Sequence, residues 1–129
     1  MILKDIIKAL FDFSPHIRYV AIYEGQNLVF EQKQSVTQGA SDSETDRFEE
    51  LLVNPTLLKL AGQRGDIDCG GLDHLIVGYG NFNQLVKATA NGHLSICLDL
   101  SADLNTLPKS IFEFISTQFP GLALNSARN

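Results

Sequence analysis

The sequence predicts an α+β domain in which five strands form one antiparallel sheet with helices on both faces. Apolar stripes at helical spacing lie near both ends of the chain, at residues 2–11 and 107–119. Between them, β-forming segments follow one another across short turns, and such hairpins make neighbouring strands antiparallel. Asn91-Gly92 is the strongest turn signal, because both residues tolerate the positive φ of a type I′ turn.

The first half of the chain contains a helix, a hairpin and a polar loop. The opening helix ends at Ser14-Pro15, and residues 16–34 form two strands joined through Gly25-Gln26. The first strand is apolar on both sides at its centre, which is typical of a strand covered on both faces, whereas the second alternates as an edge strand does. Residues 35–42 are polar and small, and we expect a loop there.

A second helix follows this loop, and a proline interrupts it. Ser41 and Glu44 have the spacing of a capping box at its start. Asn54-Pro55 must break or kink the helix, because proline lacks a backbone donor and disfavours the helical conformation of the residue before it. The helix can restart with Pro55 in its first turn and close at residues 62–65, which leaves residues 64–71 as a loop.

Three further strands are expected at residues 72–79, 82–90 and 93–100. Gly80-Asn81 and Asn91-Gly92 separate them. In the third of these strands the side chains alternate between two faces: Leu94, Ile96, Leu98 and Leu100 point one way, and Ser95, Cys97 and Asp99 the other.

A final helix at residues 107–119 completes the order helix, strand, strand, helix, strand, strand, strand, helix. The chain is long enough to bury one core and too short for two comfortable ones, so residues 1–129 form a single domain. Beyond the last helix the pattern is weak, and we expect residues 120–129 to be a mobile tail.

Composition and charge limit the class of protein. The hydrophobic fraction of 44% and the charged fraction of 19% are those of a globular domain. The net charge is −5 with both signs interspersed, so the chain offers no cationic surface to nucleic acid. Asp5 and Lys8 interrupt the N-terminal apolar pattern, which argues against a signal peptide and against membrane insertion. We expect a cytoplasmic protein with reduced thiols at Cys69 and Cys97.

Two motifs have chemical interpretations that the sequence context disfavours. Gly78-Tyr79-Gly80 holds two glycines of a dinucleotide fingerprint, but a strand follows it where the motif needs a helix, so we interpret it as a turn. Cys97 could be a nucleophile with His93 or His74 as its base. Cys97 alternates with aliphatic side chains, however, which predicts a buried and unreactive thiol.

The remaining polar residues have ordinary explanations. His93 directly follows a turn, where we expect an exposed strand end, and Cys69 is favoured as an accessible loop cysteine. The possible metal ligands do not have the sequence spacing of a metal site, although they could still come together in three dimensions. They are His16, Cys69, His74, His93 and Cys97. The helix dipole accounts for the acids at the start of the second helix: Asp42, Glu44, Asp46, Glu49 and Glu50. We therefore expect no cofactor, no metal and no enzymatic activity.

The strand at residues 72–79 is expected at a sheet edge, because it follows a long excursion through a helix. Pairing with its twin in a second chain would satisfy its open backbone groups. The kinked helix also offers more apolar surface than one sheet face needs, through Phe48, Leu51, Leu52, Leu57, Leu58 and Leu60. This excess indicates either an interface or a thick core.

The stretch GHLSICLDLSADLNTLPKSIFEFI, together with the order of elements, resembles the roadblock family, the dynein light-chain roadblock-type domains with a profilin-like fold. In that family a hairpin, here at Asn91-Gly92, leads into a strand of alternating aliphatics, here Leu94 to Leu98. A connection with aspartate and asparagine follows, matched by Asp103-Leu104-Asn105, and then the final helix. The segment IRYVAIYEGQNLVFEQ is similar to the family's first hairpin, with Gly25 in the turn.

The resemblance implies a non-enzymatic module that dimerises through residues 44–60 and 72–79 and builds one sheet across two chains. The implied interface consists of Phe48, Leu51, Leu52, Leu57, Leu58, Leu72, His74 and Ile76. Asn54-Pro55 departs from the family pattern, because it interrupts the dimerising helix. Bacterial relatives bind or regulate Ras-like small GTPases, which implies a scaffold or regulatory role, and no arginine here has a motif that assigns it to GTP hydrolysis.

A different class of function stays open beside this one. A small-molecule-binding sensor of the PAS-like group, or a small thiol-dependent enzyme, would use a pocket near Cys69, His74 and Tyr79. A ligand retained through purification, or an activity lost on Cys69→Ser, would favour that alternative. Twice the chain mass in light scattering would favour the dimer.

Overall fold

The structure is a computed structural model that describes residues 1–33 and 43–126. It confirms an α+β fold with one five-stranded antiparallel sheet. The strands lie in the order β2-β1-β5-β4-β3, so that β2 and β3 form the edges, as predicted. The expected loop at 35–42, with Ser41 of the capping box, lies outside the described residues. The strand bounds are β1 (Ile17–Glu24), β2 (Asn27–Gln32), β3 (Leu75–Gly78), β4 (Asn83–Thr89) and β5 (Gly92–Leu98).

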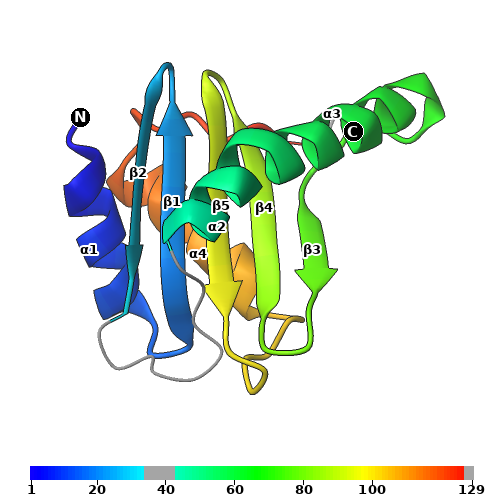
Figure 1. The fold of residues 1–129 in the computed structure, drawn as a ribbon. Helices are drawn as coiled ribbons and strands as arrows, with labels where there is room; N and C mark the ends of the chain where they lie inside the picture. Colours follow the sequence, from blue (N-terminus) through cyan, green and yellow to red (C-terminus); the bar gives the residue numbers. More distant parts are fainter. Residues whose placement is uncertain (34–42, 127–129) are drawn as a thin grey trace.

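Helices lie on both faces of this sheet (Figure 1). α1 (Leu3–Phe13) and α4 (Leu107–Gln118) cover one face. On the other face α2 (Ser43–Phe48), the π-helical η1 (Glu49–Val53) and α3 (Asn54–Asp68) form one continuous helical run. The main core lies on the α1–α4 face and includes Ile6, Ile7, Leu10, Val20, Ile22, Leu85, Leu94, Ile96, Leu98, Ile111 and Ile115.

β5 lies between β1 and β4 at the centre of the sheet. Its residues Leu94, Ile96 and Leu98 are at most 1% exposed and belong to the main core, as the alternation predicts. Leu100 does not belong to this set, because the strand ends at Leu98 and Leu100 is 59% exposed. β3 is also shorter than the predicted strand at 72–79.

The β4–β5 hairpin forms where predicted, with Thr89 paired to Gly92, but its turn differs from the expected one. Neither Asn91 nor Gly92 has a positive φ. Gly92 is required for a different reason, since a Cβ there would collide with the carbonyl oxygen of Tyr23 on β1. In the β1–β2 hairpin, Gly25 does adopt a positive φ, of 64°.

The π-helical turn η1 resolves the conflict that Pro55 creates within the helical run. Pro55 has no N–H to donate, and in the wider turn before it the Asn54 N–H donates to the carbonyl oxygen of Glu49. The predicted distortion is therefore present, as a π-bulge. The prediction that the helix closes at residues 62–65 is wrong, because α3 continues through both glycines to Asp68.

Gly65 remains inside α3 because the chain folds back onto it. A Cβ at Gly65 would lie 3.0 Å from the backbone of both Gly71 and Leu72, which is tighter than ordinary van der Waals contact, so a larger residue would push this segment away from α3. Gly70 and Gly71 turn the chain with φ values of 76° and 88°. The last turns of α3 are thereby tied to the segment that leads into β3.

Residues 120–126 of the expected tail lie against one end of the sheet. Leu122 is 1% exposed, and Leu124 forms a bridge with Thr89. The Asn125 N–H donates to the carbonyl oxygen of Ala88 at 2.9 Å. Residues 127–129 lie outside the described part of the chain.

Candidate interaction site

The helical run α2–η1–α3 turns its polar side toward the sheet. Glu50 and Asn54 are completely buried beneath it, whereas Phe48, Leu52 and Leu60 are 57%, 55% and 61% exposed. A surface helix of a globular protein normally buries its apolar stripe and exposes its polar residues. The run is therefore inverted around η1, where polar side chains face the sheet while large apolar ones are exposed among the polar residues of the outer side.

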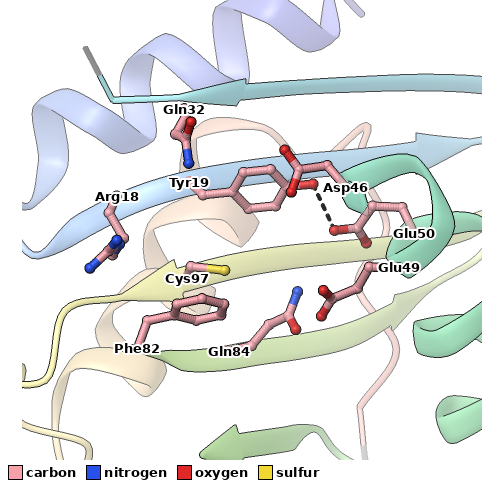
Figure 2. Close-up of a pocket in the computed structure, with 9 residues that line it drawn as sticks. All are labelled: Arg18, Tyr19, Gln32, Asp46, Glu49, Glu50, Phe82, Gln84 and Cys97. Carbon is pink, nitrogen blue, oxygen red and sulfur yellow. Dashed lines mark hydrogen bonds between the residues drawn. The ribbon is translucent and has the colours of Figure 1, made fainter. Parts of the chain in front are cut away.

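A buried polar cluster holds the inverted helix to the sheet. At its centre, the Glu50 carboxylate accepts hydrogen bonds from the Tyr19 hydroxyl, shown in Figure 2, and from the Asn54 side-chain amide, both at 2.8 Å. His93 Nε2 lies 2.8 Å from the same carboxylate and donates the third hydrogen bond. On the sheet, the Gln84 amide donates to Ser95 Oγ at 2.6 Å. The buried polar cluster thus comprises Tyr19, Glu50, Asn54, Gln84, His93 and Ser95.

Two expectations about this cluster are wrong. His93 is not at an exposed strand end, because β5 begins at Gly92 and His93 already lies beneath the helix, at 3% exposed. Glu50 is not a solvated acid stabilised by a helix dipole, since its carboxylate is fully buried and binds three donors. Within the described residues, Asn54 Oδ1 and Gln84 Oε1 of this cluster have no hydrogen-bond partner, whereas the Glu50 carboxylate binds three donors. Glu50 is therefore the contact that joins η1 to β1 and β5.

A cavity of about 10 Å³ lies beside the cluster, between η1 and the sheet (Figure 2). Its volume is about that of one water molecule, which leaves no room for a small-molecule ligand. Burial raises the pKa of the Cys97 thiol well above its usual value, and Cys97 is 5% exposed, as predicted for an inert core cysteine. Burial, with the neighbouring charge of Glu50, also raises the pKa of Glu49.

The edge strand β3 pairs with β4 on one side and, within the described residues, with no strand on the other. The Tyr79 N–H donates to the carbonyl oxygen of Phe82 at 2.9 Å, which fixes the phase of the antiparallel ladder. Because inward and outward residues alternate in such a ladder, Val77 bonds to β4 whereas the backbone groups of Ile76 and Gly78 point away from the sheet. The predicted open edge is confirmed.

The helical run crosses the sheet, and its C-terminal part reaches the edge formed by β3. Figure 1 shows α3 crossing the sheet toward β3 and continuing beyond that strand. On the projecting part of α3, Ile67 is 76% exposed. Between α2–η1 and the β3–β4 turn lies an open hollow of about 490 Å³, lined by Phe48, Tyr79 and Phe82 among others. This edge therefore combines open backbone groups with apolar side chains.

The residues of the interface that the resemblance implies do not form a single patch. Phe48 lines the hollow beside β3, and Ile76 is 40% exposed on the edge itself. Leu51, in contrast, lies beside Ile2 and Leu28 at the opposite edge, formed by β2. Of the others, Leu52 is exposed, and Leu57, Leu58 and Leu72 are half-buried.

His74 lies on the opposite face of the sheet, against α4. Its ring centroid is 5.5 Å from that of Phe112, and its Nδ1 lies 2.7 Å from the Asp73 carboxylate. The buried Lys87 reaches the same place, where its Nζ donates to the Asp73 carbonyl oxygen at 2.7 Å and lies 4.6 Å above the Phe112 ring. Burial lowers the pKa of Lys87. These contacts anchor the segment before β3 to α4.

The pocket suggested for a sensor or a thiol enzyme is not assembled. Tyr79 lines the hollow on the α2 side, His74 packs on the α4 side, and Cys69 is exposed just beyond the end of α3. The turn after Gly78 leads into β4, so its glycines face no helix N-terminus. In residues 1–33 and 43–126, no group of three His, Cys, Asp or Glu side chains could hold a metal ion.

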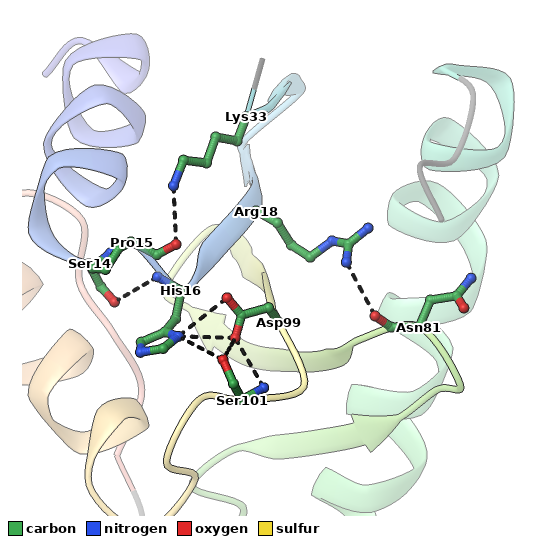
Figure 3. A network of polar contacts seen from close by, with 8 residues as sticks. All are labelled: Ser14, Pro15, His16, Arg18, Lys33, Asn81, Asp99 and Ser101. Atoms are coloured by element: carbon green, nitrogen blue, oxygen red, sulfur yellow. Dashed lines mark hydrogen bonds and ion pairs between the residues drawn. The ribbon is translucent and has the colours of Figure 1, made fainter. Parts of the chain in front are cut away.

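His16, Asp99 and Ser101 have the composition of a catalytic triad but not its geometry (Figure 3). His16 Nδ1 lies 3.0 Å from Asp99 and 3.4 Å from Ser101 Oγ, so one ring nitrogen faces both partners. A triad needs the aspartate and the serine on different nitrogens. Ser101 Oγ instead donates to Asp99 at 2.7 Å, and its N–H donates to the same carboxylate, which stabilises the turn after β5.

Comparisons of the chain with known protein families, with curated proteins and with solved structures found no match. In the described residues, none of the helices has the length and apolar character needed to span a membrane. The fold and the surface define an α+β domain in which an inverted helical run crosses one face of the sheet and reaches the open edge strand β3.

Proposed function

We propose that this protein is a non-enzymatic, homodimeric interaction module of the cytoplasm, in which the β3 strands of two copies pair into one continuous sheet. The observation that carries this proposal is the position of the open β3 edge beside the apolar, outward side of α2–η1–α3. An uncovered edge and an exposed apolar helix are both liabilities for a monomer. Pairing two copies through β3 would cover both the open edge and the exposed apolar side chains of the helix.

A two-fold axis at the β3 edge accounts for the projecting end of α3. Antiparallel pairing of Ile76 and Gly78 with their counterparts would bring the projecting helix of one copy over the sheet of the other. Leu60 and Ile67 then lie close to the hollow formed by Phe48 and its neighbours in the second copy. The exposed apolar residues of each copy would thus be buried by the other.

The dimer acts by presenting a composite surface to a protein partner. The resemblance to the roadblock family supports a Ras-like small GTPase as the partner, which the dimer would scaffold or regulate. The order of elements and the hairpin leading into the final helix support that class of module. The partner interaction is expected to need the dimer, because each copy contributes half of the surface.

Light scattering on wild-type protein and two variants tests the dimer. Ile76→Pro removes an N–H that points away from β4, so the internal ladder stays intact while the outer edge loses a donor. Ile76→Thr keeps that donor and serves as the matched control. We expect twice the chain mass for wild type and the control at micromolar concentration, and a shift to monomer for Ile76→Pro. A wild-type protein that stays monomeric at high micromolar concentration would refute the proposal.

A further inference from the structure

β2 forms the second edge of the sheet, and its outer backbone groups follow from the ladder it shares with β1. The Lys33 N–H donates to the carbonyl oxygen of Arg18 at 2.9 Å, which fixes the phase of this ladder. Inward and outward residues alternate from there. The backbone N–H and C=O groups of Leu28, Phe30 and Gln32 therefore point away from β1, toward a side where the described residues place no further strand.

A groove of about 610 Å³ runs along the start of this edge. Its walls come from both faces of the sheet, with the N-terminus of α1 on one side and α2–η1 on the other. Ile2 is 66% exposed and Leu51 is 49% exposed, and both line the groove with Leu28. The groove thus offers the open backbone groups of Leu28 with apolar side chains on either side, and the open groups of Phe30 and Gln32 continue along the same edge.

Two cations flank this groove in a chain whose net charge is −5. Lys4 lies on the α1 wall and Arg47 on the α2 wall, and both are exposed. The Arg47 guanidinium stacks over the ring of Phe30 at 5.7 Å, which holds the charge over the edge strand. An acidic occupant fits this pair of cations better than a neutral or basic one.

We propose that the β2 groove binds an extended, acidic segment of a different protein, which adds to the sheet as a sixth strand. The open backbone groups select an extended chain, the apolar walls select alternating apolar side chains, and Lys4 and Arg47 select carboxylates between them. Leu51 belongs to this partner site and not to the dimer interface.

The choice of a different protein over a second copy rests on the proposed dimer. If β3 already joins two copies, self-pairing at β2 would link dimers end to end into open chains. A heterologous strand closes the edge without that consequence. Each dimer then carries two such sites, one at each end of the continuous sheet.

Peptide binding with residue-level readout tests the site. The probes are two fluorescent peptides of about six residues, identical in valine at alternate positions and carrying either glutamate or lysine between the valines. We expect the glutamate peptide to bind at least ten-fold more tightly in fluorescence anisotropy. In ¹⁵N spectra it should shift the amides of Leu28, Phe30 and Gln32 while leaving those of Ile76 and Gly78 in place.

Two changes separate the backbone contacts from the charge contacts. N-methylation of alternate peptide amides should abolish binding without touching the protein. Arg47→Glu should weaken binding of the glutamate peptide at least ten-fold, and Arg47→Lys should keep most of the wild-type affinity. Equal binding of both peptides, no binding of either, or shifts confined to residues outside β2 would each overturn the proposal.

The same measurements on Ile76→Pro keep this result distinct from the dimer. The β2 groove lies wholly within one chain, so a monomeric Ile76→Pro variant should bind the glutamate peptide as tightly as wild type. Peptide binding by a protein that never dimerises would sustain the groove and refute the dimer. A protein that dimerises but does not bind the peptide would support the dimer and refute the groove.

Discussion

Replacing Glu50 by alanine tests whether the helical run is attached to the sheet by polar contacts. The Glu50 carboxylate is completely buried and accepts hydrogen bonds from Tyr19, Asn54 and His93, each at 2.8 Å. Alanine removes the acceptor that these three donors share, while the donors stay buried and Asn54 keeps only its 3.5 Å contact with Ser95 Oγ. An unpaired buried donor costs more than its hydrogen bond contributes when made.

The expected loss is large compared with the stability of a small domain. Each buried donor that loses its acceptor costs about 1–3 kcal/mol, and the costs at neighbouring donors do not add up exactly. Because three donors lose the same acceptor, we expect Glu50→Ala to lower the free energy of unfolding by about 3–5 kcal/mol. This loss is about a fifth or more of the roughly 5–15 kcal/mol that stabilises a typical domain.

Urea unfolding followed by circular dichroism measures this loss. The matched control is Glu44→Ala, which removes an exposed carboxylate from α2 in the same helical run. We expect that control to change the free energy of unfolding by no more than about 0.5 kcal/mol. A Glu50→Ala variant as stable as the control would show that the helix is not attached through this cluster, and the inverted orientation would lose its support.

Three further predictions concern single side chains. Burial raises the pKa of Glu49 in the folded protein, so the folded state binds the proton of Glu49 more tightly than the unfolded state does. Stability therefore falls as pH rises from the unfolded pKa through the folded pKa, and Glu49→Gln should raise the melting temperature at pH 7. A gain in melting temperature that persists below about pH 4 would contradict this reasoning. Gly92→Ala should destabilise the fold by several kcal/mol or prevent folding, because its Cβ meets the Tyr23 carbonyl, whereas Gly62→Ala in α3, with open space around it, should stabilise by about 0.5–1 kcal/mol in thermal melts. A thiol reagent should modify Cys69 in the native protein and Cys97 only after denaturant is added, and equal labelling of both in native buffer would rule out the buried position of Cys97.

The alternation of apolar residues was enough to predict the sheet and the α1–α4 core. Leu94, Ile96 and Leu98 share a face because strands have a period of two, and the long excursion through a helix predicts β3 at an edge. These features depend on local periodicity and on connection length. Both can be read from the chain alone.

The polar helix–sheet contact could not be predicted in the same way. It depends on pairing residues that are far apart in the sequence, such as Glu50 with Tyr19 and His93. One local signal was present: Glu50 and Asn54 are four residues apart on one side of a helix whose other side is apolar. That signal is ambiguous, because the polar side of a helix usually faces solvent.

The glycine roles show a second limit of sequence reasoning. Asn91-Gly92 marks the hairpin correctly, but the reason for Gly92 is a neighbouring carbonyl on β1, which no local rule reveals. Gly65 likewise reads as a helix stop, whereas the fold uses it to let residues 71 and 72 pack against α3. Close backbone approach is a tertiary property, so the sequence shows only that a glycine is present.

Amide hydrogen exchange at β3 tests the central claim most directly. In a monomer the outward amides of Ile76 and Gly78 face solvent, while Val77 is bonded to β4. If two copies pair through this edge, the exchange of Ile76 and Gly78 slows as protein concentration rises, and Val77 changes little. A protein that has twice the chain mass yet leaves Ile76 and Gly78 exchanging as fast as solvent-exposed amides would contradict β3 pairing.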